Sequence, residues 1–187
     1  MLARASGSLS ARMRRLVFLA FLLLTPRLLA APMTFFEGSL EVEVPAIFRA
    51  LDDAAIDSMF AGARSKPAVV LATPDSETRI SMTHADAPLG PEDLEDTRAS
   101  LKARIDSQAK IAWLRDEMVT LNGSPWFRLD YDMDSGADIK REIILGTSLR
   151  GRLLFVVVAT PVDDQELLNG DLQTLIDSLR LLHPVEN

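Results

Sequence analysis

The chain has 187 residues, no cysteine and a formal net charge of −7, from 20 basic and 27 acidic residues. The lack of cysteine excludes disulfides, thiolate metal sites and a cysteine nucleophile. The first 31 residues hold five of the basic residues and no acidic one, so residues 32–187 carry 15 basic against 27 acidic residues, a net charge of −12. A surface this acidic disfavours nucleic acid and anionic membrane surfaces as partners.

Residues 1–31 have the pattern of a secretory signal peptide. An arginine-containing region precedes an apolar run at 16–24, and the segment ends in the small pair Ala30-Ala31. The apolar core of about ten residues is short for a spanning helix, which needs roughly 20. We therefore predict a periplasmic or secreted protein, with cleavage near Ala30-Ala31. The alternatives are an inner-membrane anchor formed by residues 16–31, which would be the protein's only membrane contact, and a true start at Met13.

The N-terminal half of the mature chain predicts short elements separated by proline and turn residues. Leucine and valine alternate with glutamate over 40–44, as in a strand with one exposed face that Pro45 ends. Helical spacing behind Asp52 predicts a helix over 52–64. The remaining elements expected here are a hairpin of strands 68–73 and 79–83, a loop at 84–90, and a helix at 91–107.

The C-terminal half predicts an antiparallel meander that runs into a closing helix. Its four strands are expected at roughly 111–121, 126–133, 139–148 and 152–160. Asn122-Gly123, between the first two, is the strongest short signal for a two-residue hairpin turn. Seven consecutive apolar residues at 153–159 are typical of a strand covered on both faces. Apolar residues at three- and four-residue spacing then predict an amphipathic helix; they are Leu168, Leu172, Leu175, Ile176 and Leu179.

These elements predict one α+β domain over residues 32–187. Hairpins and a meander imply a largely antiparallel sheet of about six to seven strands. Unbroken apolar strands imply that helices cover both faces of that sheet, as an α/β/α sandwich.

The order of elements also resembles a known superfamily. The signals are the hairpin at 119–129, which reads Val-Thr-Leu-Asn-Gly-Ser-Pro-Trp-Phe-Arg-Leu, and the apolar strand before the closing helix that ends at 176–180. Over about residues 36–183 the chain resembles the PsbP-like superfamily. That superfamily includes a photosystem oxygen-evolving subunit, DcrB-type bacterial envelope proteins and a nuclear-import factor that binds a small GTPase. The resemblance implies the α/β/α sandwich, a non-catalytic accessory or binding role, and no cofactor or catalytic residue.

One group of residues predicts a binding surface. Basic side chains against the acidic background, with a tryptophan across the hairpin, could take an anionic ligand or an acidic partner. The alternative is ordinary charge at strand ends and a tryptophan in the core. The residues are Trp126, Arg128, Arg141, Arg150 and Arg152.

A second group of residues is a weaker candidate for calcium. Asp130, Asp132 and Asp134 alternate into a turn, and carboxylate oxygens are what this cation binds. The spacing departs from the EF-hand pattern, because glycine and glutamate fall at positions seven and thirteen (Gly136 and Glu142) instead of six and twelve. The alternative is a strand with an exposed acidic face followed by a turn.

The sequence favours an exported, non-enzymatic accessory or binding protein of the bacterial envelope. It would act on an unknown protein partner through a sheet edge or through the Trp126 and Arg128 surface. One alternative is a periplasmic immunity protein whose acidic surface masks a secreted toxin. Another is a hydrolase that uses His84 and Asp86, although no nucleophile elbow or phosphate-binding loop accompanies them.

Overall fold

The computed structural model describes residues 31–63, 65–107, 110–134, 136 and 138–182. The predicted signal peptide lies outside these residues, so its cleavage and the membrane-anchor alternative stay predictions. Among the described residues, no helix is both long enough and apolar enough to cross a membrane.

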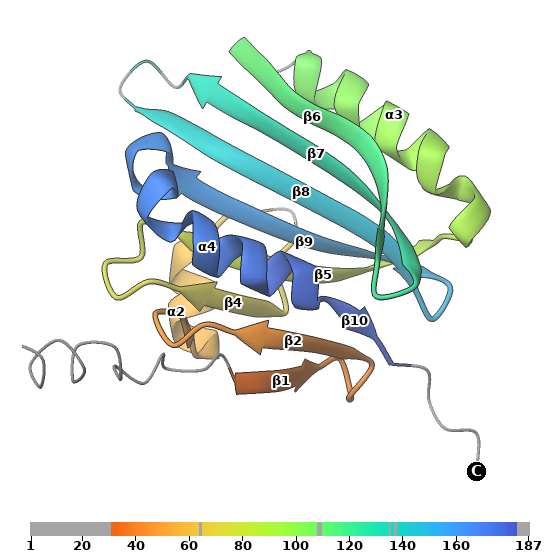
Figure 1. The fold of residues 1–187 in the computed structure, drawn as a ribbon, viewed down its shortest axis with the longest axis horizontal. Helices are drawn as coiled ribbons and strands as arrows, with labels where there is room; N and C mark the ends of the chain where they lie inside the picture. Colours follow the sequence, from red (N-terminus) through yellow and green to blue (C-terminus); the bar gives the residue numbers. More distant parts are fainter. Residues whose placement is uncertain (1–30, 64, 108–109, 135, 137, 183–187) are drawn as a thin grey trace, which may run out of the picture.

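A seven-stranded sheet, antiparallel throughout, forms the centre of the domain (Figure 1). Its strand order is β3-β4-β5-β9-β8-β7-β6, so the apolar strand β9 lies in the middle, as the sequence predicts. The strands are β3 (Arg49–Ala50), β4 (Val69–Ala72), β5 (Arg79–Pro88), β6 (Lys110–Leu121), β7 (Ser124–Asp134), β8 (Ile139–Leu149) and β9 (Arg152–Pro161).

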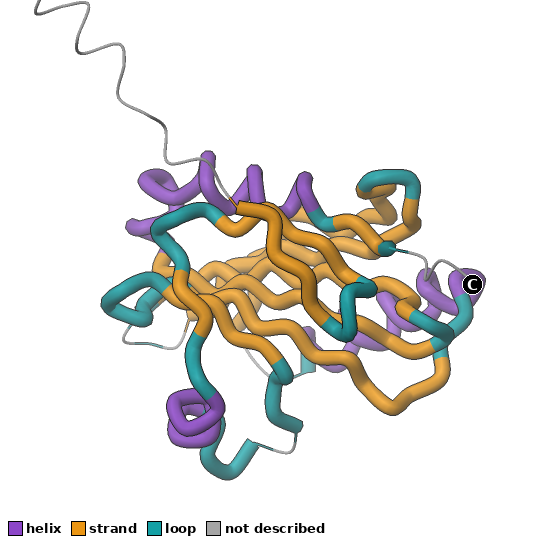
Figure 2. The backbone as a smooth tube through the Cα atoms, turned by 90° about the horizontal axis from the view of Figure 1, so that it is seen from below, coloured by secondary structure: helices purple, strands orange, loops and turns teal. Residues whose placement is uncertain are grey.

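Helices cover both faces of this sheet. Helix α4 (Val162–Ser178) lies on one face, and α2 (Asp53–Met59) and α3 (Leu94–Asp106) lie on the other (Figure 2). A 3-10 turn, η1 (Pro91–Asp93), leads into α3. Helix α2 begins behind Asp52, whose carboxylate accepts the backbone N–H of Ala55 at 2.8 Å. The predicted α/β/α sandwich is therefore confirmed, with an α2 shorter than the predicted helix at 52–64.

A small second sheet extends the layer that holds α4. It consists of β1 (Ala31–Phe35), β2 (Leu40–Val44) and β10 (Arg180–Leu181), in the order β1-β2-β10. Leu40 and Val42 of β2 are fully buried in one core cluster with residues of α4. The sequence predicts β2 but neither β1 nor β10, because both flanking strands are short and depend on β2 for their pairing.

The two faces of β9 are covered unequally. Leu154, Val156 and Val158 face α4 and are fully buried. Phe155 and Val157 face the α3 side and are only partly buried, because α3 lies over β6, β7 and β8 instead of β9. Complete cover of both faces, as the sequence predicts, is thus corrected to complete cover of one face. Beside Phe155 the uncovered part leaves a recess of about 650 Å³ along α3.

The Asn122-Gly123 turn joins β6 and β7 as predicted. Both residues have positive φ, 47° and 84°, which a two-residue turn between twisted strands requires. Pairing then runs without interruption from Leu121 opposite Ser124 to Arg115 opposite Asp130. An extra residue follows in β6, where the register shifts between Trp113 and Arg115. This hairpin determines which charged side chains of β6 and β7 lie opposite each other.

Candidate functional site

The structure separates the five residues predicted to form one binding surface. Trp126 is fully buried in the core between the sheet and α4, so it cannot contact a partner. Sequence alternation correctly places it on the same face as Arg128 and Asp130, but that face is covered by α4 instead of being exposed. The part of the prediction that rests on an exposed Trp126 is therefore corrected.

The four arginines fall into two sites at opposite ends of β8 and β9. Arg141 pairs with Thr160 at one end, while Arg152 pairs with Leu149 at the other. The two positions are eight residue steps apart along β8, from 141 to 149, which corresponds to about 26 Å. Arg128 shares a cleft with Arg141, and Arg150 shares a pocket with Arg152.

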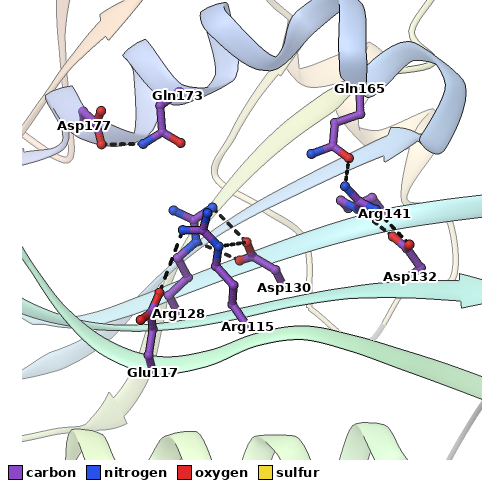
Figure 3. A network of polar contacts seen from close by, with 9 residues as sticks. All are labelled: Arg115, Glu117, Arg128, Asp130, Asp132, Arg141, Gln165, Gln173 and Asp177. Atoms are coloured by element: carbon purple, nitrogen blue, oxygen red, sulfur yellow. Dashed lines mark hydrogen bonds and ion pairs between the residues drawn. The ribbon is translucent and has the colours of Figure 1, made fainter.

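The first site is a polar cleft between α4 and the strands β6, β7 and β8 (Figure 3). Its cavity volume is about 190 Å³. We call it the arginine cleft. The charged and amide side chains that line it are Arg115, Arg128, Asp130, Arg141, Gln165, Asn169 and Gln173.

Arg128 and Asp130 form the buried centre of the arginine cleft. Their side chains are 8% and 7% exposed. The guanidinium donates from Nε to Oδ1 and from Nη2 to Oδ2, each at 2.8 Å. These two hydrogen bonds offset the free-energy cost of removing both charges from water.

Arg141 forms a second bidentate pair at the α4 side of the cleft. It donates to both carboxylate oxygens of Asp132, at 2.6 and 2.8 Å, and also to Oε1 of Gln165 on α4. The hydrogen bonds that Arg141 donates to Asp132 raise the pKa of Arg141 above its usual value. The pair thus ties the sheet to the first turns of α4.

Arg115 is the third guanidinium of the arginine cleft, and it has no comparable partner. Its Nε lies 3.5 Å from Oδ2 of Asp130, and its Nη1 lies 3.9 Å from Oε1 of Glu117. Its side chain is 52% exposed. Within the described part of the chain, Arg115 makes ion pairs but no side-chain hydrogen bond.

The three aspartates of the calcium alternative do not converge on one point. Asp130 and Asp132 are bound by arginines, and Oδ1 of Asp134 accepts the backbone N–H of Gly136 at 2.7 Å. Across the residues that the structure describes, no group of three or more histidine or acidic side chains could hold a metal ion. Arginines thus neutralise two of the three carboxylates, an arrangement that favours the alternative of an acidic strand face.

The second site is a pocket of about 570 Å³ at the opposite end of β9. Arg150 donates to Oε2 of Glu37 at 2.7 Å, and this hydrogen bond lowers the pKa of Glu37 below its usual value. Phe36 stacks edge-on against His84, with ring centroids 5.7 Å apart. Phe36, Glu37 and Arg150 all have positive φ, so two segments of the chain are held in uncommon conformations here.

Of the two residues of the hydrolase alternative, His84 lines this pocket and Asp86 binds Arg152, which also lines it, so the two do not form a catalytic pair. Nε2 of His84 lies 3.0 Å from the carbonyl oxygen of Leu149, and Asp86 accepts a hydrogen bond from Arg152 at 2.9 Å. Asp86 therefore does not orient the imidazole, as the third member of a triad would. The side chains that line the pocket include no serine or threonine.

Strand β6 forms one edge of the seven-stranded sheet (Figure 1). Its residues Leu114 and Arg115 line the arginine cleft. Among the described residues β6 pairs only with β7, so its outer backbone groups face no other strand. Leu114 and Met118 on this strand are 49% and 38% exposed, which is high for large apolar side chains. The sequence predicts binding through a sheet edge without saying which one, and β6 is the longer of the two edge strands of this sheet.

Sequence reasoning missed Arg115 and the amides of α4. A signal for Arg115 was present, because a two-residue turn at Asn122-Gly123 fixes the pairing on both sides of it. Counting outward from that turn places Arg115 opposite Asp130 and Glu117 opposite Arg128, each an acid against a base. No comparable signal existed for the amides, because their position depends on where α4 packs.

Comparisons with known proteins identify the fold. No family model and no curated protein matches the chain. Among solved structures, PsbP (CyanoP) of Synechocystis sp. PCC 6803 aligns with TM-score 0.56 and 13% identity, over 94% of this chain and 98% of its own. LpqN of Mycobacterium tuberculosis, described as involved in cell envelope biogenesis, aligns with TM-score 0.55 and 13% identity, over 82% of this chain and 90% of its own. A protein of Bacteroides thetaiotaomicron aligns with TM-score 0.52 and 9% identity, over 83% of this chain and 49% of its own. The chain has the PsbP-like fold.

Proposed function

We propose that this chain is an exported, non-catalytic accessory or binding protein of the bacterial envelope, and that a protein partner adds a strand to the edge of β6. The observation that carries the proposal is the open edge of this strand, which is 12 residues long and pairs on one side only among the described residues. An extended segment gains main-chain hydrogen bonds from such an edge and specificity from the alternating side chains.

Two features of β6 favour pairing with one particular partner strand. The regular stretch from Arg115 to Leu121 spans seven residues, or about 23 Å, which is enough for one partner strand. The extra residue at Leu114 and the charges on the edge restrict pairing by unrelated strands. The exposed Leu114 and Met118 offer apolar contacts to a matching segment.

Site-specific photo-crosslinking tests the proposed edge. A benzoyl-phenylalanine in place of Leu114 or Met118 should give a discrete adduct when the full-length protein is expressed in its own host. Matched controls replace Leu167 on α4 or Ile47 before β3, which are also exposed, at 83% and 39%. Equal adducts from all four positions, or none from the two on β6, would remove the edge as the binding surface.

The non-catalytic part of the proposal has a separate test. A His84→Ala variant should complement a deletion of the gene as well as the unchanged protein does, because His84 contacts a backbone carbonyl and no catalytic partner. Loss of complementation by a stably folded variant would favour the hydrolase alternative. The immunity-protein alternative stays a prediction.

A further inference from the structure

The arginine cleft contains three guanidinium groups but only two bidentate carboxylates. Arg128 holds Asp130, and Arg141 holds Asp132, each through two hydrogen bonds. The nearest acidic oxygen to Arg115 is Oδ2 of Asp130, at 3.5 Å, and that oxygen already accepts a hydrogen bond from Arg128. Figure 3 shows the three guanidinium groups beside α4, with Arg115 next to the pair of Arg128 and Asp130.

Arg115 also differs in its position, because it lies on the edge strand. In a strand that pairs with β6, the residue directly opposite Arg115 would lie on the same face of the sheet, with its Cβ about 4.5–5.5 Å away. That face is the one that carries α4 and the arginine cleft. The side chain of this partner residue would therefore enter the cleft beside Arg115.

We infer that the strand docked on β6 carries an aspartate or glutamate opposite Arg115, whose carboxylate forms the third bidentate pair of the arginine cleft. The inference rests on the proposed function, because it requires a partner strand at this edge. Arginine is suited to this role, since its planar fork binds both oxygens of a carboxylate.

The charged residues next to Arg115 restrict which residues the partner strand can carry. Glu117 lies two residues from Arg115 on the same face, and its side chain is 49% exposed. An acid opposite Glu117 would be destabilising, so the partner carries a basic or neutral residue two positions from its own acid. On the other face of the sheet, Asp116 is already bound by Arg98 and by Lys102, the latter at 2.6 Å. Asp116 therefore sets no requirement on the charge of the partner residue opposite it.

The acidity of the whole protein makes this pairing selective. Residues 32–187 carry a net charge of −12, so an acidic segment is repelled by most of the surface. The guanidinium of Arg115 offsets this repulsion in the register that places the partner's acid opposite it. Like charges in other registers oppose binding, which is how charged interfaces exclude incorrect partners.

The test uses photo-crosslinking at Leu114, beside Arg115, in the full-length protein in its own host. The adduct obtained with the unchanged arginine should fall at least about tenfold in Arg115→Gln and in Arg115→Glu, which corresponds to a loss of about 1.4 kcal/mol or more. Arg115→Lys should give an intermediate yield, because lysine keeps the charge but not the fork. The matched control is Lys110→Gln, an exposed charge at the other end of β6, which should leave the yield unchanged.

The outcomes separate the two proposals. If the protein with Arg115 intact gives no adduct from Leu114 or Met118, the docked strand itself is wrong. If it gives the adduct and Arg115→Gln gives the same yield, the edge stands and the acidic contact is wrong. Thermal unfolding of Arg115→Gln confirms that the variant is folded, as its 52% exposure leads us to expect.

A free small carboxylate is the other possible occupant, and it has its own measurement. The purified protein is melted in glutarate and in chloride of equal ionic strength. A rise in Tm specific to glutarate and absent from Arg115→Gln would assign the cleft to a free dicarboxylate and would overturn the docked strand as the source. Equal melting in the two salts, together with the loss of the crosslink, supports the acidic strand.

Discussion

Arg128 and Asp130 are two positions apart on β7, and they share one covered face of the sheet as a bidentate ion pair with both contacts at 2.8 Å. The pair is nearly enclosed, with side chains 8% and 7% exposed. Burying two charges costs several kcal/mol per ion before their attraction is counted, so such a pair is weak evidence for stability. It is better understood as the fixed centre of the arginine cleft, against which Arg115 lies, with Nε 3.5 Å from Oδ2 of Asp130.

The first prediction concerns this ion pair. Asp130→Asn should destabilise the protein by about 3–5 kcal/mol, because it leaves the Arg128 guanidinium buried without a counter-charge. The double variant Arg128→Met, Asp130→Leu should cost clearly less than Asp130→Asn alone. Urea unfolding of the single and double variants measures the difference, and a double variant less stable than Asp130→Asn would contradict the account.

The second prediction concerns Tyr131, the one tyrosine in the chain. Burial raises the pKa of Tyr131 above its usual value of 10.0, and its hydrogen bond to Glu142 raises it further. The folded protein therefore keeps a proton that the unfolded chain releases above about pH 10. This contribution to the unfolding free energy is fully present below pH 10 and declines as the pH rises beyond it.

Absorbance at 295 nm measures this directly, because a single tyrosine gives a single tyrosinate signal. We expect no ionisation step near pH 10 while the protein is folded, and a normal step in denaturant. Tyr131→Phe should make the decline of stability above pH 10 less steep. A tyrosinate step near pH 10 in the folded protein would show that the ring is accessible to water.

The third prediction compares two glycines. A Cβ on Gly146 would come within 2.1 Å of the Phe127 ring, which is fully buried. Gly146→Ala should therefore destabilise the protein by about 1–3 kcal/mol through overpacking. Gly170 lies inside α4, with nothing within 4 Å of an added Cβ, so Gly170→Ala should stabilise by about 0.5–1 kcal/mol. Thermal unfolding of both variants checks the opposite signs.

The fourth prediction concerns Asn122, which connects the β6–β7 turn to the end of α4. Its Nδ2 donates to the carbonyl oxygens of Asp177 and Leu179 at 2.8 and 3.0 Å. Its φ of 47° also disfavours most side chains. Asn122→Ala removes the hydrogen bonds and also places alanine at a positive φ that it adopts less readily than asparagine. Asn122→Gly removes the hydrogen bonds alone. Urea unfolding should rank Asn122→Ala below Asn122→Gly, and both below the unchanged protein by about 1–3 kcal/mol.

Short sequence patterns were enough to predict the elements whose structure depends on residues close together in the chain. Asn122-Gly123 set the register of β6 and β7, because both residues accept positive φ. Asp52 marked the start of α2, and the apolar run of β9 identified the middle strand of the sheet. The segment 84–90 was expected to be a loop, but its first part continues β5 as far as Pro88 through pairing with β9.

The sequence by itself determined the hairpin, the central strand and the closing helix, because turn chemistry and apolar spacing act over a few residues. Only the tertiary structure decided that Trp126 is buried, that Arg115 borders an open edge, and that Arg150 lies far from Arg141. Those outcomes depend on where α4 and β2 pack against the sheet. Burial is a property of surfaces that meet from distant parts of the chain, and no local pattern of residues specifies which surfaces will meet.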